Sequence, residues 1–132
     1  LRDLLKSGKL NDGTSIVWLS SLAASLATPG YTMYAASKAG LEAAARNMAR
    51  DLALRGIRLN CIAPGMIESE MADLAGEKIS EEALSQHFKE YPLGPGRLND
   101  VSEAAAFLLS VQSRWITGTV LTLDGGFGLM KG

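Results

Sequence analysis

The sequence predicts an α/β fold built on a parallel sheet, in which three short strands alternate with helices. The apolar segments at 14–19, 57–62 and 118–123 have the length of buried strands, and turn residues bound them. The first segment shows no alternation of polar with apolar residues, which favours a parallel strand covered on both faces. Helical segments separate the strands, and this order indicates right-handed crossovers within one sheet.

Three parallel strands are few for such a sheet, because a parallel sheet needs both its faces and its edges covered. The chain has 132 residues, which is one domain at most. Its hydrophobic content of 47% and charged content of 20% suit a soluble globular core. The first residue is Leu1 rather than Met. We therefore expect a fold that is incomplete by itself.

The charge and the composition limit the classes of partner. The net charge of −1 gives no sign of binding to nucleic acid or to an anionic membrane surface. No apolar run approaches the ~20 residues that cross a bilayer, and the N-terminus has no signal-peptide pattern. The one cysteine, Cys61, excludes a disulfide within the chain and fits a reducing compartment. We therefore expect a cytoplasmic protein.

The residues before the first strand are predicted to finish a helix and then to turn. Gly8 is a typical helix-ending residue, and Asn-Asp-Gly at 11–13 is a turn signal. Between the first two strands, residues 31–55 form the longest predicted helix, and Gly56 ends it. Its apolar residues recur at helical spacing, at Leu41, Ala45, Met48 and Leu52.

Small residues make parts of this helix narrow, so that another helix can approach it closely. They are Ala35, Ala36, Ala39, Gly40, Ala43 and Ala44. One interpretation is that the helix packs against a second subunit. The other is that an alanine-rich helix lies tightly on its own sheet, and the sequence alone favours neither.

The chain beyond the second strand is predicted to turn and then to form another helix. Ala-Pro-Gly at 63–65 turns out of the strand, because proline fixes φ and glycine permits unusual backbone angles. Asn99 or Asp100 caps a helix that runs to about Val111, with Glu103 placed as in a capping box. Five residues of that helix are expected to face inward: Val101, Ala104, Ala105, Leu108 and Leu109.

Residues 70–95 contain both polar and apolar residues, and one interpretation is a helical hairpin on the surface. Their expected apolar face comprises Ile79, Leu84, Phe88 and Tyr91. His87 stands there without a second histidine or a nearby cysteine, so nothing supports a metal or hydrolase site. Residues 92–96 form a Gly/Pro linker. The glycines at 125, 126 and 128 are predicted to form a flexible C-terminal turn with no helix after it.

One group of polar residues is suited to chemistry. Ser20 and Ser21 follow the first strand, at the edge where ligands bind in open α/β sheets. Tyr34 and Lys38 lie four residues apart near the start of the next helix and therefore share a face. An ammonium beside a phenol favours the phenolate, and such a phenol facing the Ser21 hydroxyl can exchange a proton with a carbonyl or an alcohol. The alternative is a packed tyrosine near a solvated lysine.

Ser21 followed by Tyr34-x-x-x-Lys38 resembles the active-site signature of the short-chain dehydrogenase/reductase family. IVWLSS at 16–21 resembles the strand that carries the serine, and 34–65 resembles the long active-site helix, the next strand and its Pro-Gly turn. ITGTVLTLDGG at 116–126 resembles the last strand. The resemblance implies the C-terminal half of one doubly wound, parallel-sheet (Rossmann-type) domain over 1–132. It also implies a mobile substrate lid at about 68–95.

The resemblance implies an NAD(P)-dependent oxidoreductase that transfers a hydride between nicotinamide and a carbonyl or alcohol substrate. Ser21 would orient the substrate oxygen, and Tyr34 would exchange a proton with it. Lys38 would favour the phenolate of Tyr34 and bond the nicotinamide ribose, which makes both residues cofactor-binding as well as catalytic. Four further residues would hold the nicotinamide ring: Pro64, Gly65, Ile67 and Ser69, the last standing where the family more often has threonine.

Within the family, residues 92–110 and 116–126 look most like 3-oxoacyl-[acyl-carrier-protein] reductases of fatty acid synthesis, and then sugar or alcohol dehydrogenases. The resemblance therefore implies a small-molecule carbonyl or alcohol substrate, with 3-oxoacyl thioester reduction as one such reaction. It also implies a homodimer or a homotetramer. The sequence implies no metal.

Several parts of the family pattern are absent from this sequence. They are the glycine-rich phosphate-binding loop, the Asn-Ala-Gly segment and the catalytic asparagine. Without these parts the sequence cannot hold the adenosine half of a dinucleotide, and it does not distinguish NAD from NADP. The alternative to an enzyme is a truncated, non-catalytic fragment or an assembly module of such an enzyme. An unrelated α/β binding domain is a weaker alternative.

Overall fold

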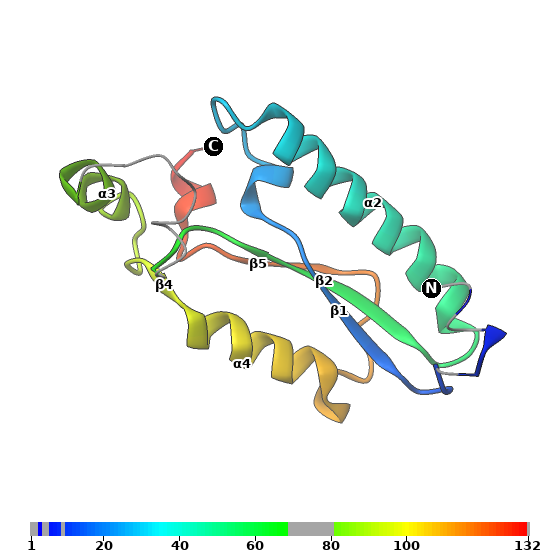
Figure 1. The fold of residues 1–132 in the computed structure, drawn as a ribbon. Coiled ribbons are helices and arrows are strands. Elements are labelled where there is room, and N and C mark those ends of the chain that lie inside the picture. Colours follow the sequence, from blue (N-terminus) through cyan, green and yellow to red (C-terminus); the bar gives the residue numbers. More distant parts are fainter. Residues whose placement is uncertain (1–2, 4–5, 9, 69–80, 132) are drawn as a thin grey trace.

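The computed structural model describes residues 3, 6–8, 10–68 and 81–131. Over these residues the chain forms the predicted alternation of strands and helices (Figure 1). The elements, in chain order, are β1 (Ser15–Leu19), η1 (Leu22–Ala24), α2 (Thr32–Ala53), β2 (Arg58–Pro64), β3 (Ile67–Glu68), α3 (Glu81–Phe88), β4 (Gly96–Arg97), α4 (Leu98–Leu109), η3 (Val111–Ser113), β5 (Val120–Leu123) and η4 (Phe127–Met130).

Three of the strands form one parallel sheet in the order β1-β2-β5. Leu19 of β1 lies opposite Ile62 and Leu123 of β5 lies opposite Pro64, so all three strands end at the same edge. The predicted parallel α/β fold is therefore confirmed. A two-residue parallel pair joins β3 to β4, and the sequence did not indicate it.

The sheet carries a helix on each face, as a doubly wound fold requires. Figure 1 shows α2 on one side of the strands and α4 on the other. Leu59 and Cys61 of the central strand pack beneath α2 in a cluster with Ala45, Ala49 and Leu52. Fully burying a leucine or isoleucine is worth about 1.5–3 kcal/mol, so this cluster fixes α2 on the sheet.

The opposite face of β2 is tied to α4 by polar groups. The guanidinium of Arg58 donates to the Leu108 carbonyl at 2.9 Å, to the Ser110 carbonyl at 2.8 Å and to Ser113 Oγ at 2.8 Å. The last carbonyls of a helix have no partner within it, so Arg58 satisfies the C-terminal end of α4.

Asn60 has a similar role one step along the strand, and its side chain is fully buried. Its Nδ2 donates to the Ile116 carbonyl at 3.0 Å, and its Oδ1 accepts from the Thr119 amide at 3.1 Å. A buried amide is stable only when its donors and acceptors are paired. Asn60 therefore fixes the loop that leads into β5.

Two apolar positions are more exposed than the sequence predicted. β1 was predicted to be buried on both faces, but it is half-buried and Leu19 is 55% exposed, because β1 is an edge strand of the described sheet. Leu109 was predicted to face inward, but it is 51% exposed. Leu108 is 1% exposed and lies near the centre of the buried stripe of α4. Leu109 follows it and is therefore turned about 100° away around the helix axis.

Two predicted boundaries are also wrong. The turn predicted at 63–65 begins later, because pairing with β5 keeps β2 extended through Pro64. Helix α4 begins at Leu98, before the predicted caps. Asp100 is its third residue, and its carboxylate accepts from the Arg97 amide at 2.7 Å. Asp100, rather than the predicted Glu103, therefore supplies the carboxylate of the capping box.

The C-terminal turn is fixed by a carboxylate rather than flexible. Asp124 accepts from the Gly126 amide at 3.1 Å and from the Gly128 amide at 2.8 Å. Gly126 has φ 87°, a conformation that glycine adopts without strain. The short helix η4 follows at once, whereas the sequence predicted no helix there.

Candidate active site

Ser20 and Ser21 lie at the carboxyl end of β1, as predicted. The Ser20 amide donates to the Ile62 carbonyl at 2.7 Å and so extends the β1–β2 ladder by one residue. The backbone then turns into η1, and Ser21 Oγ accepts from the Ala23 amide at 3.2 Å. Ser21 is half-buried. Its hydroxyl is therefore held at the edge of the sheet where ligands bind in this class of fold.

The structure brings Tyr34 and Lys38 together on α2. Lys38 Nζ lies 5.7 Å from the centroid of the Tyr34 ring, within the range of a cation–π contact. The same ammonium donates to the Leu19 carbonyl at 2.9 Å. Tyr34 is 44% exposed, so a ligand can reach its hydroxyl. Lys38 thus connects the helix that carries the phenol to the strand that carries the serines.

A second connection between α2 and β1 was missed by the sequence reasoning. Ser20 Oγ donates to Glu42 Oε1 at 2.6 Å, and the two residues are 5% and 8% exposed. Glu42 lies four residues after Lys38, so the spacing that joins Tyr34 to Lys38 continues for one more turn. That continued spacing was the sequence signal that could have indicated it.

The cysteine of the chain belongs to the core rather than to the site. Cys61 is fully buried on β2. Burial is the main cause that raises the pKa of its thiol, and the Glu42 carboxylate raises it further. A thiol must ionise to act as a nucleophile, so Cys61 is unsuited to that role.

Pro64 and Gly65 lie where β2 ends, next to the end of β5. The Gly65 amide donates to the Leu123 carbonyl at 2.8 Å. A Cβ at Gly65 would lie 3.1 Å from Cε1 of Tyr91 and 3.2 Å from Cα of Asp124. Packing within the protein therefore favours glycine here. Ile67 follows in β3, and Ser69 lies outside the described residues.

A small apolar cluster joins the serine turn to the segment after β2. Its buried members are Leu22 of η1, Tyr91 and Phe127, with Leu26 and Met66 packed against them. The Met66 amide donates to Tyr91 Oη at 3.1 Å. Tyr91 was predicted only as part of an apolar face, and no local sequence pattern indicates a contact across 25 residues.

A hollow of about 520 Å³ opens beside this edge. Residues 23–29 line it together with Thr32 and Ala35, so it lies between the turn after Ser21 and the first turns of α2. Alanine makes up much of its wall, and Tyr34 is not among the lining residues.

Within 3, 6–8, 10–68 and 81–131, no three His, Cys, Asp or Glu side chains gather as a metal site would require. Among the helices described, none is both long enough and apolar enough to cross a membrane.

The fold and the site together define a class of protein. Polar side chains converge at the carboxyl edge of an open, doubly wound parallel sheet, which is where nucleotide cofactors bind in such folds. A family model described as enoyl-(acyl carrier protein) reductase matches residues 2–128. The chain belongs to the short-chain dehydrogenase/reductase family, as its sequence motifs indicated.

Similar sequences include reductases of bacteria. The 3-oxoacyl-[acyl-carrier-protein] reductase FabG of Thermotoga maritima is 43% identical over 113 residues, which are 85% of this chain and 44% of that protein. The enzyme of the same name from Rickettsia felis is 39% identical over 126 residues, 95% of this chain and 51% of that protein. The chain therefore spans about half the length of the curated relatives it matches.

Solved structures of similar fold agree with this assignment. A short-chain dehydrogenase family protein from Francisella tularensis has a TM-score of 0.84 and 30% identity, over 97% of this chain and 55% of that one. A blue fluorescent protein from a metagenomic library, solved in complex with NADPH, has a TM-score of 0.79 and 33% identity. That match covers 92% of this chain and 48% of the fluorescent protein.

Proposed function

We propose that the complete protein carrying this chain is an NAD(P)-dependent oxidoreductase that interconverts a carbonyl and an alcohol. The observation that carries the proposal is the position of Lys38, whose ammonium contacts both the Tyr34 ring and the last carbonyl of β1. This contact sets a phenol, an ammonium and the serine turn at one edge of the sheet. The membership of the family supports the same conclusion.

Ser21, Tyr34 and Lys38 are the proposed catalytic residues. The Ser21 hydroxyl orients and polarises the substrate oxygen. Tyr34 gives its hydroxyl proton to that oxygen when a carbonyl is reduced and takes it back when an alcohol is oxidised. The positive charge of Lys38 lies beside the ring and attracts the negative charge that this exchange leaves on the Tyr34 oxygen.

The proposed cofactor is NAD or NADP, and when bound its nicotinamide ring supplies or accepts the hydride at the substrate carbon. The donors of the site fit its ribose, because an ammonium has three N–H groups and the Leu19 carbonyl accepts one of them. We place the ring against Pro64, Gly65 and Ile67, with the hydroxyl of Ser69 as a fourth contact.

The proposed substrate is a small carbonyl compound or alcohol, with the 3-oxoacyl thioester group as the first candidate. The names of the similar bacterial reductases support this candidate. A homodimer or homotetramer in the cytoplasm is the proposed state of the complete protein, by relation to the same family.

The test is the replacement Tyr34→Phe in the complete gene product. It removes one hydroxyl, and we expect turnover to fall by about 10²–10⁴-fold, the range of a lost general acid. Tyr31→Phe is a matched control, because Tyr31 is a neighbouring exposed tyrosine whose ring meets that of Tyr34 edge-on at 6.0 Å. Normal turnover of the Tyr34 variant would contradict the proposal.

A second candidate is a non-catalytic fragment or assembly module. The intact mass of the natural protein and its binding of NADH or NADPH separate the two candidates. A mass near 14.0 kDa without binding supports the fragment, and a mass near twice that value with binding supports the enzyme.

A further inference from the structure

Tyr91 contacts the segment that leads from β2 into β3. Its hydroxyl accepts the Met66 amide proton at 3.1 Å, and Cε1 of its ring would lie 3.1 Å from a Cβ added at Gly65. Tyr91 is 6% exposed. One buried side chain therefore holds the two residues that immediately precede Ile67.

The ring of Tyr91 is itself held from three sides. It stacks on Phe127 of η4 with centroids 4.6 Å apart and an interplanar angle of 23°. The imidazole of His87 at the end of α3 meets it edge-on at 5.4 Å, and Leu22 of η1 belongs to the same cluster. A ring fixed by three elements is a rigid support for the backbone that it touches.

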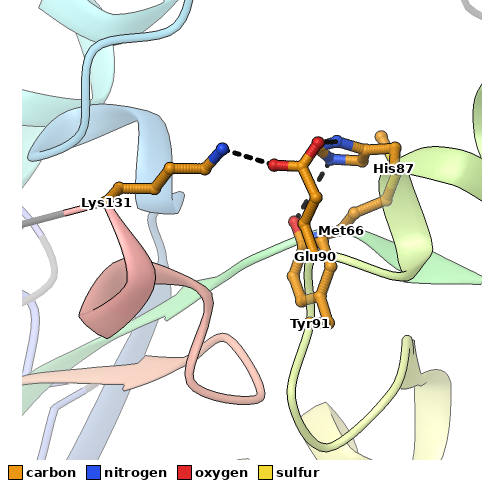
Figure 2. A network of polar contacts seen from close by, with 5 residues as sticks. All are labelled: Met66, His87, Glu90, Tyr91 and Lys131. Atoms are coloured by element: carbon orange, nitrogen blue, oxygen red, sulfur yellow. Dashed lines mark hydrogen bonds and ion pairs between the residues drawn. The ribbon is translucent and has the colours of Figure 1, made fainter.

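Figure 2 shows that the hydroxyl of Tyr91 also belongs to a chain of polar contacts. His87 Nε2 lies 3.5 Å from Tyr91 Oη, and His87 Nδ1 lies 3.8 Å from a carboxylate oxygen of Glu90. The other oxygen of Glu90 pairs with Lys131. Burial raises the pKa of the Tyr91 phenol, so the group stays a neutral hydroxyl that accepts from Met66.

We propose that Tyr91 is a positioning residue that fixes the backbone of Met66 and Ile67 through its contacts with Gly65 and the Met66 amide. This inference rests on the proposed function, in which Ile67 holds the nicotinamide ring. Tyr91 does not touch the reacting atoms. Tyr91 sets where the nicotinamide ring can lie, because losing the acceptor of the partly buried Met66 amide costs free energy that a shift of this backbone toward another partner would recover.

The test replaces Tyr91 with Phe in the complete protein, which keeps the stacked ring and removes the acceptor. Thr117→Val is the matched control, because Thr117 Oγ1 accepts from the Leu59 amide at 3.2 Å, far along β2 from the site. Both variants remove one hydroxyl that accepts from a backbone amide. The readouts are the Kd of NADH and NADPH, hydrogen exchange at the affected amide, and the urea midpoint.

We expect Tyr91→Phe to weaken dinucleotide binding by about three- to tenfold, the effect of one hydrogen bond, and to speed exchange at the Met66 amide. Thr117→Val should speed exchange at Leu59 and leave dinucleotide binding unchanged. Unchanged binding in Tyr91→Phe, or unchanged exchange at Met66, would overturn the positioning role while the proposed function stands. A wild-type protein that binds neither dinucleotide would overturn the proposed function and this inference with it.

Discussion

At the scale of single residues, the hydrogen bond between Ser20 and Glu42 is important for stability. The Ser20 hydroxyl donates to a carboxylate in the interior of the protein. The oxygens lie 2.6 Å apart, and both residues are buried between β1 and α2. Ser20→Ala removes the donor, so the carboxylate remains without this partner. We expect the free energy of unfolding to fall by about 1–3 kcal/mol, measured by urea denaturation.

Ser102→Ala provides the comparison for that variant. Ser102 is an exposed serine of α4 whose hydroxyl bonds the Asn99 carbonyl within the same helix. Its replacement should change stability by less than about 0.5 kcal/mol. Equal losses in the two variants would mean that the buried bond contributes nothing particular to holding α2 on β1.

At the scale of an element, α4 depends on a residue that lies outside it. Arg58 of β2 donates to two carbonyls at the C-terminal end of α4 and to the Ser113 hydroxyl of η3. Arg58→Lys keeps the charge but loses the planar fork that reaches all three acceptors. We expect a loss of about 1–3 kcal/mol in unfolding free energy, with faster hydrogen exchange over 104–110.

Arg50→Lys on the exposed face of α2 is the control for that variant, since it makes the same chemical change near another helix end. It should leave both quantities near the wild-type values. If Arg58→Lys behaves like Arg50→Lys, the end of α4 is satisfied by the Ser15 and Ser113 hydroxyls that also reach the Leu108 carbonyl.

The segment after η4 is connected to the end of α3 by an exposed ion pair, visible in Figure 2. The hydrogen bond from Lys131 is the main cause that lowers the pKa of Glu90 below its ordinary value of 4.5. A lowered carboxyl pKa adds stability above that value, and the contribution is lost as the pH falls through the folded pKa. Salt should weaken it, because the pair is exposed.

Lys131→Gln should therefore raise the pKa of Glu90 toward 4.5, as followed by NMR titration of its carboxyl carbon. The stability of the variant should also depend less on pH below that value. Lys89→Gln removes the same charge from the neighbouring residue, which contacts Gln86 instead. If the pKa of Glu90 moves equally in both variants, the shift comes from the overall charge of the region and not from the ion pair with Lys131.

At the scale of the whole molecule, the sequence predicted the features that depend on residues close together in the chain. Hydrophobic patterns indicated the three strands and the long helix, and the four-residue spacing placed Tyr34 beside Lys38. The pairing of Ser20 with Glu42, of Met66 with Tyr91 and of Arg58 with α4 could not be predicted. These contacts join residues 22 to 50 positions apart, and they exist only because the sheet brings the elements together.

The sequence left open whether the small residues of α2 pack on their own sheet or against a second subunit, and the structure answers this in part. Ala45 and Ala49 pack on the sheet, so part of the alanine content serves the chain's own core. Four other small residues are exposed, namely Ala36, Gly40, Ala43 and Ala44. An added Cβ at Gly40 would meet no atom within 4 Å, although a mid-helix glycine costs about 1 kcal/mol relative to alanine. Packing within the described chain therefore does not explain Gly40.

A second subunit lying on this face would explain it, and the prediction concerns the assembly of the complete protein. Gly40→Leu places a bulky side chain on the exposed face and should convert the proposed dimer or tetramer to a smaller species, measured by sedimentation equilibrium. Gly40→Ala is the control, because it keeps the surface narrow and should stabilise the helix by about 0.5–1 kcal/mol. An unchanged mass for a folded Gly40→Leu protein would mean that subunits meet elsewhere. A smaller mass would show that α2 presents its proposed catalytic residues on one side and a subunit contact on another.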